Sequence, residues 1–203
     1  MPYTGAQLID DVARRLRDTS NTGYPRAMVL RYLNACQKLI NIRLGLLQAT
    51  TTLTTLDKAL YQLDTATPRV LTVRETLGGH ELANVPWDRL VAQDVDWIRT
   101  HGERAEMWSQ MGRDVLIITP IPADETSLTI TFVKYPTTLA DDAGAWTLPD
   151  EFKSLLTDLV EGVLLFRARE FNAMQEAMNR AAPRLGLEDA AQIVRRGTPG
   201  RSN

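Results

Sequence analysis

The chain has 203 residues, of which 44% are hydrophobic and 24% charged, and its formal net charge is −2. These values are close to those of an average soluble globular protein and exclude a wholly disordered chain or a collagen-like fibre. No apolar run reaches the roughly 18 residues that a membrane-spanning helix needs, and the charged N-terminal segment does not resemble a signal peptide. The one cysteine, Cys36, excludes an internal disulfide and suits a reducing cytoplasm.

The charge balance argues against a dedicated nucleic-acid binder, because 23 basic residues face 25 acidic ones. Nineteen of the basic residues are arginines, whose planar guanidinium groups suit protein interfaces. The two histidines, His80 and His101, are few for a chain that would depend on histidine for catalysis or metal binding. We therefore expect a protein that is not an enzyme and that has no cofactor or metal.

The N-terminal part of the chain has the apolar spacing of two helices. Thr4 and Gln7 form the pattern of a capping box, and apolar residues then recur at helical spacing. Pro25 stands at the start of a second segment whose wide apolar face indicates packing on two sides. Cys36 lies on this face, so we expect a buried structural thiol rather than a nucleophile.

Near residue 50 the apolar period changes from helical spacing to alternation. Residues 50–56 are rich in threonine, and several short alternating segments follow, of which 127–133 is the clearest. The pair Gly78-Gly79 predicts a hairpin turn, and residues 86–100 are typical of a short helical or irregular excursion. The pattern predicts an antiparallel module of about six short strands.

Helical spacing returns at Pro149, and the segment after Val194 is basic and without apolar anchors, so we expect an extended tail there. The predicted fold class is α+β, with a helical bundle of two N-terminal and one or two C-terminal helices and an inserted antiparallel β module. The predicted boundaries are 1–48 and 146–194 for the discontinuous helical bundle, 49–145 for the β insertion, and 195–203 for the C-terminal tail.

Both histidines are more simply interpreted as loop residues than as metal ligands or catalytic groups. His80 and Glu81 lie at a predicted loop tip, without a second histidine or cysteine at ligand spacing, so a solvated turn is expected. His101, with Glu103 and Glu106 nearby, is more typical of a polar loop than of an acid–base cluster.

The acidic and basic runs are also weak signals. Asp94 and Asp96 match only part of a calcium loop, and they could serve a hydrolase only if their carboxylates converged in a pocket. Arg14, Arg15 and Arg17 alternate with aspartates, which is typical of a solvated helix face.

Four stretches carry a resemblance to a known family, through their order and spacing along residues 4–180. They are Tyr32-Leu33-Asn34-Ala35-Cys36-Gln37; the threonine-rich strand and its return at 51–63, followed by 69–74; residues 88–97, ending in Asp94-Val95-Asp96-Trp97; and Leu148-Pro149-Asp150-Glu151-Phe152, which opens a helix reaching Leu165-Phe166-Arg167-Ala168. With these patterns the chain resembles the head-to-tail adaptor proteins of tailed bacteriophages.

The resemblance implies a structural protein of the virion, made in the host cytoplasm, and not an enzyme. It implies a ring of twelve copies that joins the portal protein to a tail or nozzle protein and lets double-stranded DNA pass, with no membrane involved. Family adaptors commonly reach the portal through a terminal extension, so Arg195, Arg196 and Arg201 are the candidate portal-binding residues. The alternative is a nucleic-acid-binding module in which these arginines form a basic C-terminal arm.

Overall fold

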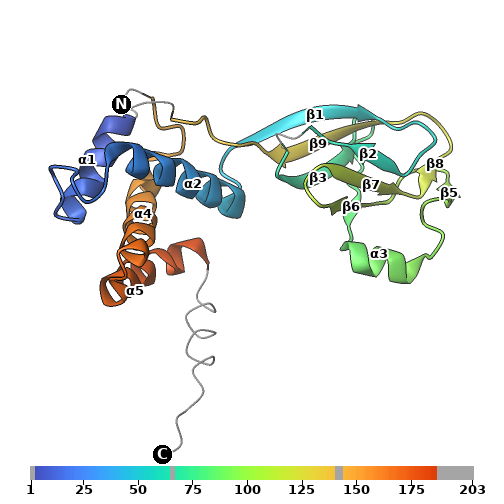
Figure 1. Ribbon diagram of the computed structural model, residues 1–203. Coiled ribbons are helices and arrows are strands. Elements are labelled where there is room, and N and C mark those ends of the chain that lie inside the picture. Colours follow the sequence, from blue (N-terminus) through green and yellow to red (C-terminus); the bar gives the residue numbers. More distant parts are fainter. Residues whose placement is uncertain (1–2, 65–66, 140–143, 187–203) are drawn as a thin grey trace, which may run out of the picture. The chain divides into compact units, whose positions relative to one another are not determined.

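The computed structural model describes residues 3–64, 67–139 and 144–186 (Figure 1). Over these ranges the fold is α+β, and the chain divides into two compact units. Unit 1 is drawn from Met1–Leu44 and Pro136–Asn203, and unit 2 is Gly45–Tyr135. The first and last parts of the sequence therefore build one unit, and the middle builds the other.

The described part of unit 1 is helical. Its elements are α1 (Gly5–Arg15), α2 (Arg26–Leu44), the 3₁₀ turn η1 (Asp150–Phe152), α4 (Lys153–Arg167), α5 (Phe171–Ala181) and the 3₁₀ turn η2 (Pro183–Leu185). Helix α1 begins with the predicted capping box: the Gln7 N–H donates to the Thr4 hydroxyl at 3.3 Å, and the Thr4 N–H donates to the Gln7 side chain at 2.9 Å.

The predicted helical bundle is wrong. In a bundle the helices run nearly parallel or antiparallel and each buries one stripe. Here α1, α2 and α5 all pack on α4, and Figure 1 shows α2 and α5 crossing α4 steeply rather than running alongside it. Helix α4 buries nine of its 15 residues, so it is a central helix covered on several sides. Helices α1 and α5, with 11 residues each, are also short for a bundle seam.

Unit 2 contains the strands and one short helix. In chain order its elements are β1 (Gln48–Thr54), β2 (Leu60–Gln62), β3 (Arg69–Glu75), β4 (Ala83–Asn84), α3 (Trp87–Gln93), β5 (His101–Gly102), β6 (Met107–Met111), β7 (Val115–Thr119), β8 (Ile121–Pro122) and β9 (Ser127–Val133). They form three sheets, with strand orders β1-β9-β3, β2-β7-β6-β4 and β5-β8.

The sequence predicted an antiparallel β module, and this is wrong for two of the strand pairs. Strand β4 pairs with β6 in parallel, and β5 pairs with β8 in parallel. Between β4 and β6 the chain crosses over through α3, and a crossover is what brings two strands side by side in the same direction. The sheets are therefore a substantial part of the fold, and unit 2 also includes the helix α3.

Strand β7 explains how the core of unit 2 is arranged. Its residues Leu116 and Ile118 belong to one apolar cluster, while the intervening Ile117 belongs to a second cluster that includes Leu90 of α3 and Trp97. All three β7 residues are fully buried. A strand covered on both faces is continuously apolar rather than alternating, which accounts for its Leu-Ile-Ile sequence.

Candidate functional site

Asp94, the first aspartate of the acidic pair after α3, stabilises a turn. The Asp94 carboxylate accepts hydrogen bonds from the Asp96 N–H at 2.9 Å and from the Thr100 hydroxyl at 2.5 Å. Trp97, within this turn, packs edge-on against Trp87 with ring centroids 5.0 Å apart. Within the ranges that the structure describes, no group of three or more His, Cys, Asp or Glu residues is placed to hold a metal ion. Asp94 is therefore engaged in local structure, and nothing in this arrangement supports a hydrolase.

The two histidines have separate surroundings: His80 is half-buried in the loop after the two glycines, and His101 is exposed at the start of strand β5, not in the loop that was expected. The acidic group beside His101 is Asp57, with 3.8 Å between the imidazole Nδ1 and the carboxylate, and both side chains are more than half exposed. The carbonyl of His80 accepts the Glu75 N–H at 2.8 Å, which closes the β3 hairpin beyond the two glycines. Glu81 pairs with Arg74 at 2.7 Å on the surface. His80 therefore lies in a loop, as expected, whereas His101 pairs with Ile121 of β8 in a strand.

The remaining predicted residues have separate positions. Cys36 is buried, as predicted, and burial raises the pKa of its thiol to about 12. Arg14 pairs with Asp11 on the surface of α1, while Arg15 reaches Asp158 on α4. The candidate portal-binding residues lie outside the described residues; they are Arg195, Arg196 and Arg201.

Two amides of α2 hold the chain segment that precedes α4. The side chain of Asn34 donates to the Leu139 carbonyl at 2.9 Å and accepts the Leu139 N–H at 2.8 Å. Gln37, which is fully buried, donates to the Thr137 carbonyl at 3.1 Å and to the Asn34 side chain at 2.8 Å. Asn34 and Gln37 therefore act as a clasp on backbone about 100 residues away.

A third residue of the same stretch contacts the end of α4. The Arg167 guanidinium donates to the Tyr32 hydroxyl at 2.7 Å, and its carbon lies 5.9 Å from the Tyr32 ring centroid, within cation–π range. This contact joins the first and the last of the four stretches noted in the sequence. The sequence reasoning missed it. The sequence signal for the clasp is the pair of amides, Asn34 and Gln37, on a helix whose buried face is mostly apolar.

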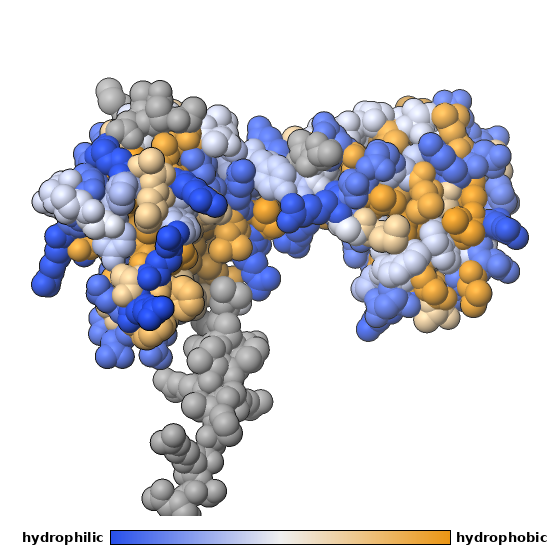
Figure 2. Space-filling view, viewed as in Figure 1, coloured by the Kyte–Doolittle hydropathy of each residue, from blue (hydrophilic) through white to orange (hydrophobic). Residues whose placement is uncertain are grey.

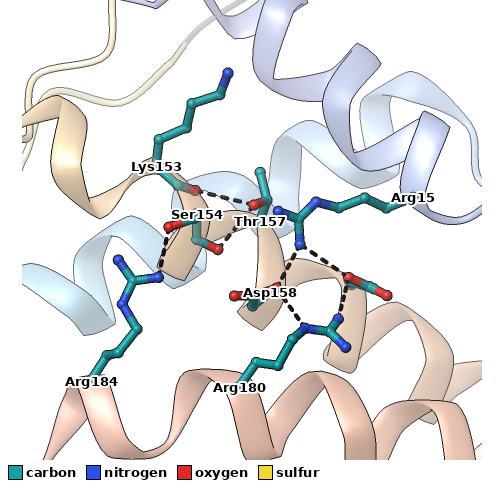
Figure 3. A network of polar contacts seen from close by, with 8 residues as sticks. Arg15, Lys153, Ser154, Thr157, Asp158, Arg180 and Arg184 are labelled. Atoms are coloured by element: carbon teal, nitrogen blue, oxygen red, sulfur yellow. Dashed lines mark hydrogen bonds and ion pairs between the residues drawn. The ribbon is translucent and has the colours of Figure 1, made fainter.

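Charged side chains tie α1, α4 and α5 together (Figure 3). The carboxylate of Asp158 accepts from Arg15 at 2.5 Å and from Arg180 at 3.1 Å. Glu161 accepts from the same two arginines, at 3.4 Å and 2.9 Å. The hydrogen bond to Asp158 raises the pKa of Arg180. Arg184 donates to Ser154 at 2.7 Å beside this network. The network is a brace between helices, because its charges are paired within unit 1.

An exposed pair of aromatic rings marks the junction of α4 and α5. Phe166 and Phe171 are 58% and 55% exposed, and their rings meet edge to face with centroids 6.1 Å apart. We call Phe166, Arg167 and Phe171 the aromatic corner. Large aromatic side chains next to arginine, left open to solvent, are typical of protein-binding surfaces. Figure 2 shows apolar atoms on the visible face of both units.

The comparison with protein families decides the identity. The model of the SU10 adaptor protein family matches residues 3–202. The chain belongs to this family. The search of curated proteins gave no match. The match confirms the resemblance to bacteriophage adaptor proteins and, because it runs through both units, covers the four stretches on which that resemblance was based.

In this adaptor several residues of the four stretches serve the fold of their own unit. Tyr32, Asn34 and Gln37 hold other parts of unit 1, and Trp97 is packed in the core of unit 2. Of the helices described in the structure, none is long and apolar enough to cross a membrane. Other residues of the same stretches are exposed, among them Phe166 and Arg167 of the aromatic corner, and such exposed residues are the ones open to partners.

Proposed function

We propose that this protein forms a ring that joins the portal protein of a tailed bacteriophage to a tail or nozzle protein. The observation that carries the proposal is the family match over nearly the whole chain. The protein then acts in the virion, at the head–tail junction, as a structural component without catalysis. We propose twelve copies per ring, with double-stranded DNA passing through the ring.

The net charge of the protein supports a ring that lets DNA pass without binding it tightly. The net charge of −2 lacks the basic excess with which proteins neutralise phosphates. A wall without dense basic clusters lets the duplex slide. No observation among the described residues favours the alternative of a dedicated nucleic-acid-binding module.

The aromatic corner is the best-supported contact surface for ring assembly or portal docking. A ring is closed by a heterologous contact, in which one surface of each copy meets a different surface of the next. The corner combines two exposed rings with a guanidinium, so its complement should be apolar and acidic. A pocket of about 380 Å³ in unit 2 fits that description only in part, because its apolar lining and Asp57 are accompanied by Lys58 and Arg99.

The C-terminal arginines are proposed as a second, separate contact. Arg195, Arg196 and Arg201 can form bidentate pairs with carboxylates of the portal. Truncation after Val194 tests this contact directly. If the shortened chain joins the portal as well as the full chain does, the C-terminal segment is not a docking element.

The decisive experiment is size measurement of the full-length protein, alone and mixed with a portal ring. We expect a ring-sized complex with the portal, and loss of that complex in Phe171→Asp. Because Phe171 is more than half exposed, this variant should keep the circular dichroism of the parent. The matched control is Leu77→Asp, which alters an 86% exposed apolar residue at the β3 hairpin of unit 2.

Three outcomes separate the claims. A stable monomer that ignores the portal would overturn the adaptor proposal. A complex that forms equally well with Phe171→Asp would remove the aromatic corner but leave the adaptor role. Equal loss of the complex in both variants would show that any added surface charge disrupts assembly, and it would contradict a specific role for the corner.

A further inference from the structure

Strand β1 is an open edge of the three-stranded sheet. Among the described strands it pairs with β9 alone, from Gln48 opposite Val133 to Thr54 opposite Ser127. At the two ends, the Thr55 N–H donates to the Thr126 carbonyl at 2.8 Å and the Lys134 N–H donates to the Leu47 carbonyl at 3.0 Å.

These end bonds fix the direction of every backbone group in β1. In an antiparallel ladder, alternate residues direct their N–H and C=O groups to the partner strand. Since residues 47 and 55 bond to β9, the other odd-numbered residues do so too. The even-numbered residues therefore turn their backbone groups away from the sheet. They are Gln48, Thr50, Thr52 and Thr54.

Nothing in the sequence of β1 protects this edge. Proteins usually protect an exposed edge with charged residues, proline, a bulge or a covering segment. The β1 sequence Gln-Ala-Thr-Thr-Thr-Leu-Thr has no charge and no proline, and its register with β9 is continuous.

The other edge strand of the same sheet, β3, is protected. Strand β3 has a register shift between Val70 and Thr72. Its outward groups are also occupied: the Glu75 N–H donates to the His80 carbonyl at 2.8 Å, and the Val73 carbonyl accepts the Leu82 N–H at 2.9 Å. Because β3 is protected and β1 is not, β1 is the edge of this sheet that is available to a partner strand.

The side chains on both faces of β1 are compatible with a partner strand at its edge. Leu53 packs against the apolar cluster of unit 2 on one face. On the other face Thr50, Thr52 and Thr54 lie opposite Thr131, Thr129 and Ser127 of β9. On these two strands the six side chains are neutral hydroxyls, so an identical row can lie opposite them without charge repulsion.

We propose that β1 binds the β1 strand of a second copy of this chain, antiparallel and about a two-fold axis at Thr51. In this register Thr50 lies opposite Thr52 of the second copy, and Gln48 opposite its Thr54, so all four outward residues pair. Any charge near the axis would meet its own like, and β1 carries none. Among the described strands the remaining open edges have two or three residues, so only β1 matches β1 in length.

The contact is independent of the proposed ring. A two-fold contact uses one surface on both copies, whereas a ring contact uses two different surfaces. The strand edge is in unit 2, and the aromatic corner is in unit 1. A dimer through β1 and a ring through the corner can therefore fail or succeed separately.

The test compares full-length variants by sedimentation over a range of concentrations. Thr52→Pro removes an outward N–H while leaving the bonds to β9, because proline is tolerated on the open side of an edge strand. Thr52→Lys places two equal charges close together across the axis. Thr129→Lys is the matched control, since Thr129 lies on the same face but in the central strand. We expect dimers for the parent and the control, and at least a 100-fold weaker dimer for both Thr52 variants.

Amide hydrogen exchange, resolved by residue, identifies the strand that binds. In the dimer the N–H groups of Thr50 and Thr52 should exchange slowly, and in dilute solution quickly, whereas Thr51 and Leu53 should be protected throughout. Dimers unaffected by Thr52→Pro, or a parent that is monomeric at every concentration, would overturn the proposal. Protection of Thr50 and Thr52 only after another protein is added would assign the edge to that protein and would also overturn it.

Discussion

Removing both arginines that contact Asp158 should cost more stability than removing Asp158 itself. The Asp158 side chain is 8% exposed, whereas those of Arg15 and Arg180 are 36% and 47% exposed. In Arg15→Ala/Arg180→Ala a buried carboxylate loses its partners, which costs about 3–5 kcal/mol in comparable sites. In Asp158→Ala the guanidinium groups keep Glu161 and water, so the cost should be about 1–2 kcal/mol.

Urea unfolding of the single and double variants measures this difference. Each single arginine variant leaves Asp158 one partner, so the double variant should lose more than the sum of the two. Arg14→Ala is the control, because its pair with Asp11 is on the surface and should matter by less than about 0.5 kcal/mol. A double variant as stable as Asp158→Ala, or strictly additive single effects, would refute this account of the network.

Three further predictions concern single residues. Leu159→Asp puts an unpaired charge at a 5% exposed position of α4 and should abolish soluble folded protein, measured by expression and circular dichroism. Cys36, with a pKa near 12, should resist a thiol reagent at pH 8 until urea unfolds the chain; labelling of the native protein would contradict its burial. Backbone hydrogen bonds, that of Tyr24 first, lower the pKa of Asp18, so its stabilising effect should be present above pH 4 and be lost as the pH falls further; Asp18→Asn should flatten this acid limb of the stability profile.

Local structure was predictable from the sequence where it depends on neighbouring residues. The capping box at Thr4 and Gln7 and the change of period near residue 50 both appear in the structure. The helical bundle was wrong because the apolar surface of α4 indicates burial but not the direction from which other helices approach. The two parallel strand pairs were missed because they join segments about 20 residues apart through α3 or through a hairpin, and alternation alone does not reveal direction.

The contacts of the family stretches were beyond sequence reasoning for a similar reason. Gln37 lies among the apolar residues of α2, but nothing near it in the sequence indicates its partner, which is a backbone carbonyl 100 residues later. The Tyr32 contact with Arg167 spans 135 residues. Hydrogen bonds of this range are set by the tertiary fold, and no local pattern encodes the pairing.

These contacts also separate residues that hold the fold from residues that are open to partners. Asn34, Gln37 and Trp97 are directed into their own units, so they do not decide which proteins the chain binds. Partner choice must depend on residues that the fold leaves open. The aromatic corner and the edge of β1 are two such places, one offering side chains and the other backbone groups. Side chains can discriminate between partners, whereas a backbone edge requires only an extended strand of suitable length, which a second copy of the chain already has.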